Sequence, residues 1–189
     1  MQRKDLKTRN ISRPTVSQIE EELKRRSHIG KIKRAMRNIV ISLIIVASVT
    51  VLIAMLWLPV MQVHGTSMEP VLNDGEILVA VRGQRYIRRG DIVAFYYNNQ
   101  VLVRRVVCLG GKHISIEEDG TVYINSQALE EPYLENKSVG QCNTAFPYFI
   151  PSGYAFVMGD NREIAMDSRL EEIGPVPMGR IIGKVILTI

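Results

Sequence analysis

The sequence predicts a mostly β protein in which an antiparallel β domain follows one transmembrane helix. Residues 39–61 form an apolar run that contains no charged side chain. After this run, short segments rich in Val, Ile and Tyr alternate with turn residues, which is typical of antiparallel strands. A chain of 189 residues has room for one modest domain and such an anchor.

The chain divides into a basic N-terminal arm (1–37), a transmembrane helix (38–61) and a β domain (62–189). A helix over the apolar run matches a hydrocarbon core of about 30 Å at about 1.5 Å per residue. The run is also longer than the apolar core of a signal peptide, which has about 7–15 residues. Trp57, near the end of the run, is either an interfacial anchor or a packing residue.

Charge predicts the orientation of the helix. Residues 1–37 hold 12 of the 24 Lys and Arg but only 4 of the 19 Asp and Glu. On the other side of the run, the first charged residue is Glu69. The positive-inside rule therefore predicts a single-pass cell-membrane protein with a cytoplasmic N-terminus and an extracytoplasmic β domain. The part of the arm over residues 17–37 is either a solvated tail, a helix continuing into the span or a segment lying on anionic lipid.

The charge of the β domain disfavours one class of partner. The net charge of +5 comes from the arm, because residues 38–189 hold 12 Lys and Arg against 15 Asp and Glu. A nucleic-acid surface on the β domain is therefore disfavoured. The two cysteines, Cys108 and Cys142, are too few for a disulfide scaffold or a zinc site, and a single bridge between them stays open.

Strands are predicted wherever a β-rich run lies between turn signals such as Asn73-Asp74-Gly75 and Asp119-Gly120. Residues 126–151 contain prolines and few strand-like runs, so we predict a long excursion between strands. The predicted strands cover residues 77–82, 91–97, 101–107, 113–117, 121–124, 154–158 and 179–187.

Three short motifs are candidates for chemistry. GTSMEP lies at residues 65–70, VRRVV at 103–107 and MGDNREIAMDSR at 158–169. Taken singly, the first and third are turn sequences with surface charges. In the second, strand alternation sends Arg104 and Arg105 to opposite faces, so one of them must point inward or into a cleft.

Together, in this order and after one span, the motifs resemble the bacterial type I signal peptidases of the single-span kind, over about residues 38–189. The resemblance implies an antiparallel β domain of the signal peptidase I kind. It also implies a serine endopeptidase that removes signal peptides from secretory precursors after a small-x-small sequence. Ser67 matches the nucleophile, its N–H group is implied to help form the oxyanion hole, and Gly65 to Met68 match the substrate groove. The supporting positions are Gly159, Asp160, Asn161, Arg162, Asp167, Ser168 and Arg169, with an ion pair expected between Arg162 and Asp167.

The chain departs from this family at the general base. Arg104 occupies the position of the family's base, a lysine, and a guanidinium effectively cannot release its proton near neutral pH. Ala165 occupies the position of the serine that hydrogen-bonds that lysine. The turn at residues 108–112 also differs. His64, His113 and Lys112 are weaker candidates for a replacement base, and each is more simply read as a solvated polar residue.

Two functions follow. The first is a working peptidase with Ser67 as nucleophile and an unidentified base. The alternative is a catalytically impaired signal-peptidase-like protein that binds precursors or pilin-like proteins and assists pilus assembly. The expected partners are these polypeptides and membrane lipid. No metal and no organic cofactor is expected, because a serine mechanism needs none.

Overall fold

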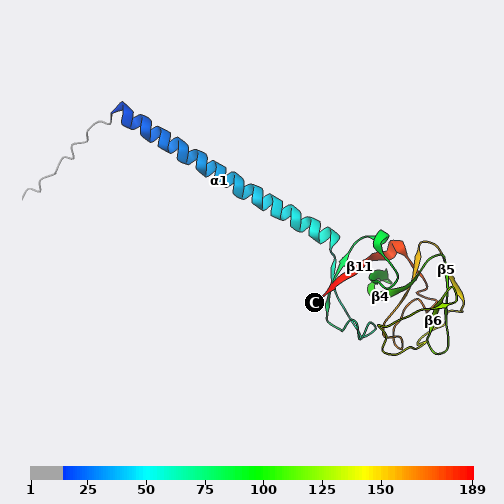
Figure 1. Ribbon diagram of the computed structural model, residues 1–189. Coiled ribbons are helices and arrows are strands. Elements are labelled where there is room, and N and C mark those ends of the chain that lie inside the picture. The colour runs from blue at the N-terminus through cyan, green and yellow to red at the C-terminus, as the bar shows by residue number, and fades with distance from the viewer. Residues whose placement is uncertain (1–14) are drawn as a thin grey trace, which may run out of the picture. The chain divides into compact units, whose positions relative to one another are not determined.

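The computed structural model describes residues 15–189, so the first 14 residues of the predicted arm lie outside it. The chain divides into two compact units, with the boundary between Ile53 and Ala54. The first unit holds most of one long helix, and the second holds the end of that helix and all of the strands (Figure 1). The mostly β fold predicted from the sequence is confirmed.

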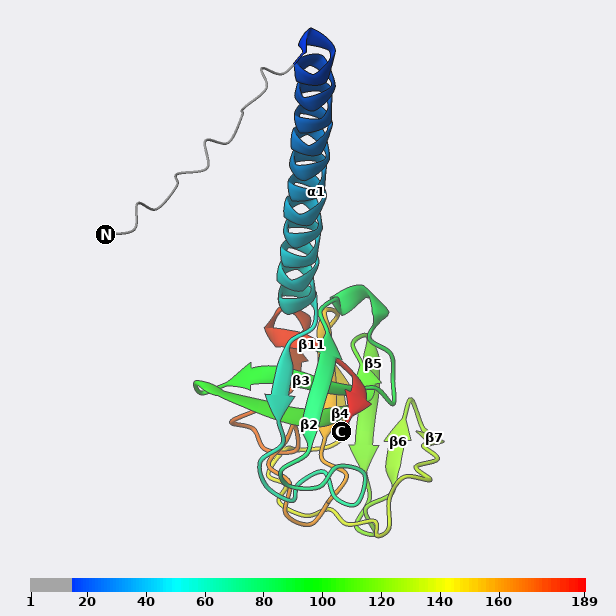
Figure 2. The same ribbon diagram turned by 90° about the vertical axis from the view of Figure 1, so that its left-hand side faces the viewer.

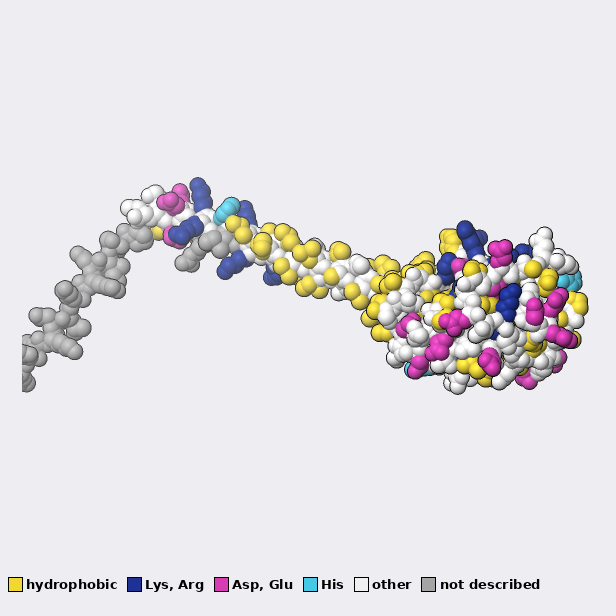
Figure 3. All heavy atoms as spheres, turned by 60° about the horizontal axis from the view of Figure 1, so that its bottom comes forward, with side chains coloured by type: hydrophobic (Ala, Val, Ile, Leu, Met, Phe, Trp, Pro, Cys, Tyr) yellow, Lys and Arg dark blue, Asp and Glu magenta, His cyan; other side chains and the backbone are white. Residues whose placement is uncertain are grey.

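Helix α1 covers Val16–Trp57, and it includes the described part of the basic arm as well as most of the apolar run. Its apolar part is long and apolar enough to cross a membrane, and the apolar side chains along it are exposed (Figure 3). Ser48 and Thr50 donate their hydroxyl protons to the carbonyls of Ile44 and Val46, at 2.8 and 2.9 Å. These bonds satisfy the hydroxyls within the helix, as an apolar surrounding requires.

The helix ends before the boundary predicted for the span. Pro59 lacks an N–H group and disfavours helical backbone at the residue before it. The chain then becomes extended, and Val60–Gln62 forms strand β1, paired with β2. Residues 58–61 are therefore outside the helix, and the predicted boundary at residue 61 is too late.

The strands form two antiparallel sheets. In the larger sheet the order is β1-β2-β11-β3-β4-β9-β10, and Figure 2 shows β2 and β11 side by side. The smaller sheet has the order β7-β6-β5-β8. The bounds in the larger sheet are β1 Val60–Gln62, β2 Ile77–Val81, β3 Ile92–Tyr97, β4 Gln100–Leu109, β9 Tyr154–Met158, β10 Val176–Pro177 and β11 Ile181–Thr188. The bounds in the smaller sheet are β5 Lys112–Ile116, β6 Val122–Ile124, β7 Gln127–Ala128 and β8 Tyr148–Ile150.

Each of the seven predicted strands corresponds to a strand of the structure, with differences at the ends. Residues Gln84–Tyr86 and Met178–Arg180 form short 3-10 helices, the second of which replaces the start of the last predicted strand. The predicted excursion over residues 126–151 is partly wrong, because β7 and β8 lie within it. Both strands are too short to show an alternating pattern in the sequence.

Strand β4 lies at the centre of the core. Its residues from Val103 to Cys108 are all buried, because hydrophobic clusters cover both of its faces. Val106 packs with Phe95, whereas Val107 packs with Phe156. Strand alternation predicts that one of the two neighbouring arginines points inward or into a cleft, but Arg104 and Arg105 are both buried. Each of them therefore needs hydrogen-bond acceptors inside the protein.

Candidate functional site

Ser67 lies in the loop between β1 and β2, and it is half-buried. The loop is anchored by Met68 and Leu72, whose side chains are buried against the core. Its start is held by the N–H group of Gly65, which donates to Asp74 Oδ1 at 2.7 Å. Gly65 has a φ of 86°, a backbone conformation that favours glycine. This loop, residues 63–76, is called the serine loop below, and it presents the Ser67 hydroxyl at a defined place.

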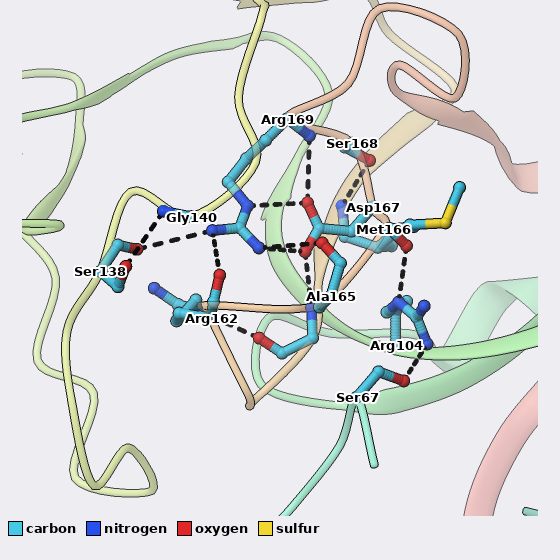
Figure 4. Close-up of polar contacts among 12 residues, drawn as sticks. Ser67, Arg104, Ser138, Gly140, Arg162, Ala165, Met166, Asp167, Ser168 and Arg169 are labelled. Atoms are coloured by element: carbon cyan, nitrogen blue, oxygen red, sulfur yellow. Dashed lines mark hydrogen bonds and ion pairs between the residues drawn. The ribbon is translucent and has the colours of Figure 1, made fainter. Parts of the chain in front are cut away.

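Arg104 is the side chain that meets this hydroxyl (Figure 4). Its Nη1 donates to Ser67 Oγ at 2.8 Å and to the Val103 carbonyl at 2.6 Å. Its Nε donates to the carbonyl of Met166 at 3.0 Å. With only 5% of its surface exposed, Arg104 is held between the serine loop and the loop after β9.

The charge of Arg104 decides what this contact can do. Burial lowers the pKa of Arg104 from its ordinary value, and the carboxylate of Asp167 opposes that shift. The ordinary pKa of a guanidinium is above about 12, so the group stays protonated near neutral pH. Arg104 therefore donates to Ser67 Oγ and does not accept its proton.

The segment after β9 fixes the serine loop from the other side. The N–H group of Asn161 donates to the Ser67 carbonyl at 3.1 Å, and Asn161 Nδ2 donates to the Thr66 carbonyl at 3.2 Å. A Cβ atom on Gly159 would lie 2.5 Å from the Ser67 carbonyl oxygen and 2.3 Å from Ala165 Cβ. Glycine at this position is therefore required for the close approach of the two loops.

The predicted ion pair between Arg162 and Asp167 is wrong. Asp167 pairs with Arg169, with Nη2–Oδ2 at 2.8 Å and Nε–Oδ1 at 2.9 Å, and both side chains are fully buried. Asp167 also accepts a hydrogen bond from the N–H group of Gly159 at 2.9 Å. Ser168 Oγ accepts one from the N–H group of Val157 at 3.0 Å. These contacts hold the third motif against the end of β9 (Figure 4).

Arg162 instead pairs with Glu131, a residue that lies outside the three motifs. Arg162 Nη1 lies 3.2 Å from Glu131 Oε2, Nη2 contacts Oε1, and both side chains are buried. Tyr133 donates its hydroxyl proton to Glu131 Oε1 at 2.7 Å. Both residues lie in the predicted excursion, and their only signal in the sequence is an acidic residue and a tyrosine in a loop. Burial and the Glu131 carboxylate raise the pKa of Tyr133.

Arg105 continues this buried network on the opposite face of β4. It forms a bidentate ion pair with Asp160, with distances of 2.7 and 2.5 Å. Its guanidinium lies 4.0 Å from the centre of the Tyr133 ring, a cation–π contact. Burial raises the pKa of Asp160, and the contact with Arg105 opposes that shift. Two adjacent arginines of one strand therefore have separate roles, one at Ser67 and the other in the scaffold.

Two clefts open beside Ser67. One has a volume of about 460 Å³, and the other about 280 Å³. Both are lined by His64, Ser67, Leu102 and Arg104. Along residues 100–104, β4 pairs only with β3, because β9 begins to pair at Arg105. Next to Ser67, the edge of β4 that faces away from β3 is therefore not covered by β9.

The alternative bases are not in contact with the serine. His64 is exposed in both clefts, but within residues 15–189 the only side chain that hydrogen-bonds Ser67 Oγ is Arg104. Lys112 and His113 lie on β5 in the other sheet, where the His113 ring packs on Phe149 with centroids 5.0 Å apart. The described residues contain no cluster of His, Cys, Asp and Glu suited to a metal ion. Cys108 and Cys142 are both free, so a bridge between them is absent from the structure.

In comparisons with known proteins, one family model and several bacterial relatives match this chain, and all of them are signal peptidases. The sequence model of the family described as "Signal peptidase, peptidase S26" matches residues 33–189. The chain is 40% identical to signal peptidase I of Bacillus licheniformis over 133 residues, which cover 64% of this chain and 70% of that protein. It is 38% identical to signal peptidase I U of Bacillus subtilis over 151 residues, covering 74% and 80%. For signal peptidase IB of Staphylococcus aureus the identity is 33% over 142 residues, covering 65% and 73%.

Proposed function

The chain belongs to the peptidase S26 family of signal peptidases, and we propose that it binds the cleavage region of secretory precursors beside Ser67 but cleaves them slowly or not at all. The hydrogen bond from Arg104 Nη1 to Ser67 Oγ supports this proposal most directly. A serine nucleophile needs a neighbouring group that accepts its proton, and a protonated guanidinium only donates.

The uncovered edge of β4 supports binding of an extended peptide. Backbone groups at a free strand edge pair with an added strand, and pockets beside that edge select alternate side chains. The clefts of about 460 and 280 Å³ lie beside this edge and are lined partly by Val101 and Leu102. A segment with small apolar residues at alternate positions fits such a surface. The small-x-small region of secretory precursors, or of pilin-like proteins, has this pattern.

The location of the site relative to the membrane is part of the proposal. We place the N-terminus in the cytoplasm and the β domain outside, because Lys and Arg crowd the N-terminal side of the apolar run. Protease added to intact protoplasts should then digest the β domain. Protection of the β domain until the membrane is opened would contradict this orientation.

A working signal peptidase is the second candidate, and two observations favour it. Ser67 is retained and is held by an ordered loop, and the relatives named above are signal peptidases. His64 lines both clefts, and histidine is the residue type that most often serves as a general base. In this case His64 would have to approach Ser67 when a substrate binds.

Binding and cleavage of one precursor peptide distinguish the two candidates. The full-length protein in detergent is mixed with a labelled peptide that carries a small-x-small region, and with a control peptide in which the small residues are replaced by Phe. We expect binding of the first peptide only, with no product on the timescale on which a lysine-bearing relative completes the reaction. Ser67→Ala should leave binding nearly unchanged. Cleavage at an ordinary rate that is lost in Ser67→Ala would establish the working peptidase instead.

A further inference from the structure

A third cleft lies at the end of α1, away from Ser67. It has a volume of about 720 Å³ and shares no lining residue with the two clefts beside the serine. Its main lining residues are Trp57, Arg82, Arg85, Tyr86, Tyr96 and Ile182. All of these residues belong to the unit Ala54–Ile189.

Backbone hydrogen bonds fix this cleft at the end of the helix. The N–H group of Arg82 donates to the carbonyl of Trp57, the last helical residue, at 3.1 Å, and that of Ala80 donates to the Pro59 carbonyl at 3.0 Å. A helix that crosses a membrane ends at one of the two membrane surfaces, whichever way it is oriented. The cleft is therefore tied to the level of the lipid headgroups.

The two arginines of the cleft differ from the other arginines of the β domain described above. Arg82 and Arg85 are exposed, and within residues 15–189 neither side chain has an ion-pair or hydrogen-bond partner. Arg104, Arg105 and Arg162 are instead buried, and each donates hydrogen bonds to acceptors inside the domain. A pair of free guanidiniums on one cleft presents donors that match the oxygens of a phosphate group.

Exposed aromatic rings surround these donors. Trp57, Tyr86 and Tyr96 are 62%, 74% and 58% exposed. Aromatic side chains of this kind concentrate where hydrocarbon meets headgroups, because one part of the ring system is apolar and another part forms hydrogen bonds. An apolar and aromatic wall beside two cations fits a ligand that has both a phosphate and a hydrocarbon part.

We propose that this cleft binds the headgroup phosphate of an anionic phospholipid. General attraction does not account for such binding, because residues 38–189 hold 15 Asp and Glu against 12 Lys and Arg, so the domain as a whole is repelled by an anionic surface. Binding must then come from the local pair, Arg82 and Arg85. A bound headgroup would hold the β domain at the membrane independently of any peptide at Ser67.

The single tryptophan of the chain provides a direct assay, because Trp57 lines the cleft. The full-length protein is reconstituted in phosphatidylcholine bilayers that contain a fixed fraction of a lipid brominated near the headgroup. That lipid is either phosphatidylglycerol or phosphatidylcholine. We expect stronger quenching of Trp57 fluorescence by the brominated phosphatidylglycerol. In Arg82→Gln/Arg85→Gln the relative affinity for this lipid should fall by roughly fivefold for each arginine removed.

Arg88→Gln/Arg89→Gln is the matched control, because it removes two exposed arginines that do not line the cleft. This variant should keep the preference of the parent protein. Equal quenching of the parent by both lipids, or an equal loss in both double variants, would overturn the proposal. Inorganic phosphate at matched ionic strength should leave the preference intact. Loss of the preference at the phosphate concentration of an ordinary buffer would mean that the cleft takes free phosphate in preference to the headgroup, and it would overturn the lipid assignment.

Discussion

Arg104 Nη1 donates a 2.8 Å hydrogen bond to Ser67 Oγ, and the same nitrogen is fixed by the Val103 carbonyl. The residue that we propose at the nucleophile position and the one that we propose at the position of the general base are therefore in direct contact in this chain. A neutral lysine at this position would accept the hydrogen bond of the serine hydroxyl and then its proton. The protonated arginine instead donates a hydrogen bond to the serine oxygen, so it cannot act as the general base.

Restoring the lysine should restore cleavage. In Arg104→Lys/Ala165→Ser the amine can become neutral and the new hydroxyl can orient it. Positioned general-base catalysis contributes roughly 10²–10⁴-fold, so cleavage of a precursor should rise by about that factor and be visible on a gel. Ala165 is fully buried beside Gly159, so Ala165→Ser alone serves as a control for packing effects. A parent protein that already cleaves at the rate of the double variant would contradict the prediction.

The restored enzyme should have a defined pH dependence. Burial lowers the pKa of the group at position 104 and Asp167 opposes this shift, so a lysine there should titrate below its ordinary pKa of about 10.4. The neutral amine is the base, and the cleavage rate should therefore rise with pH up to the lysine pKa and then level off. Initial rates across this pH range measure the curve. A rate that falls as pH rises from neutral would exclude lysine as the base.

The ion pair between Glu131 and Arg162 should be important for stability. Both side chains are buried, so Glu131→Gln leaves a buried guanidinium without its counter-charge, at a cost of about 3–5 kcal/mol. Chemical unfolding of the full-length protein in detergent measures this loss. The neighbouring Glu130 is exposed, and Glu130→Gln should change the free energy of unfolding by less than about 0.5 kcal/mol. Equal effects of the two variants would show that the pair is not needed.

Gly159 should be needed for the shape of the site. In Gly159→Ala the new methyl group would overlap the Ser67 carbonyl oxygen and Ala165 Cβ. We expect a loss of about 1–3 kcal/mol and weaker binding of the precursor peptide, because the serine loop has to move. Gly179→Ala is the matched control, since nothing lies within 4 Å of its added Cβ atom. Unchanged peptide binding in Gly159→Ala would contradict the prediction.

Local patterns were sufficient for the helix and for most of the strands. The uncharged run predicted the helix, and the alternating β-rich runs predicted strands as far apart as 77–82 and 154–158. The arginine at position 104 was visible in the sequence, and its chemistry does not depend on the fold. Such features depend on residues that are neighbours along the chain, so the sequence alone determined them.

The tertiary structure decided which charges meet. Arg162 and Asp167 are close in sequence and were expected to pair, yet Arg162 pairs with Glu131 and Asp167 pairs with Arg169. The side chain of Glu131 reaches Arg162 from a loop 31 residues earlier in the chain, and the course of that loop depends on the pairing of the short strands on either side of it. A buried charge takes the partner that the packing brings within hydrogen-bond distance. That distance is a property of the folded chain and has no counterpart in the spacing of the sequence.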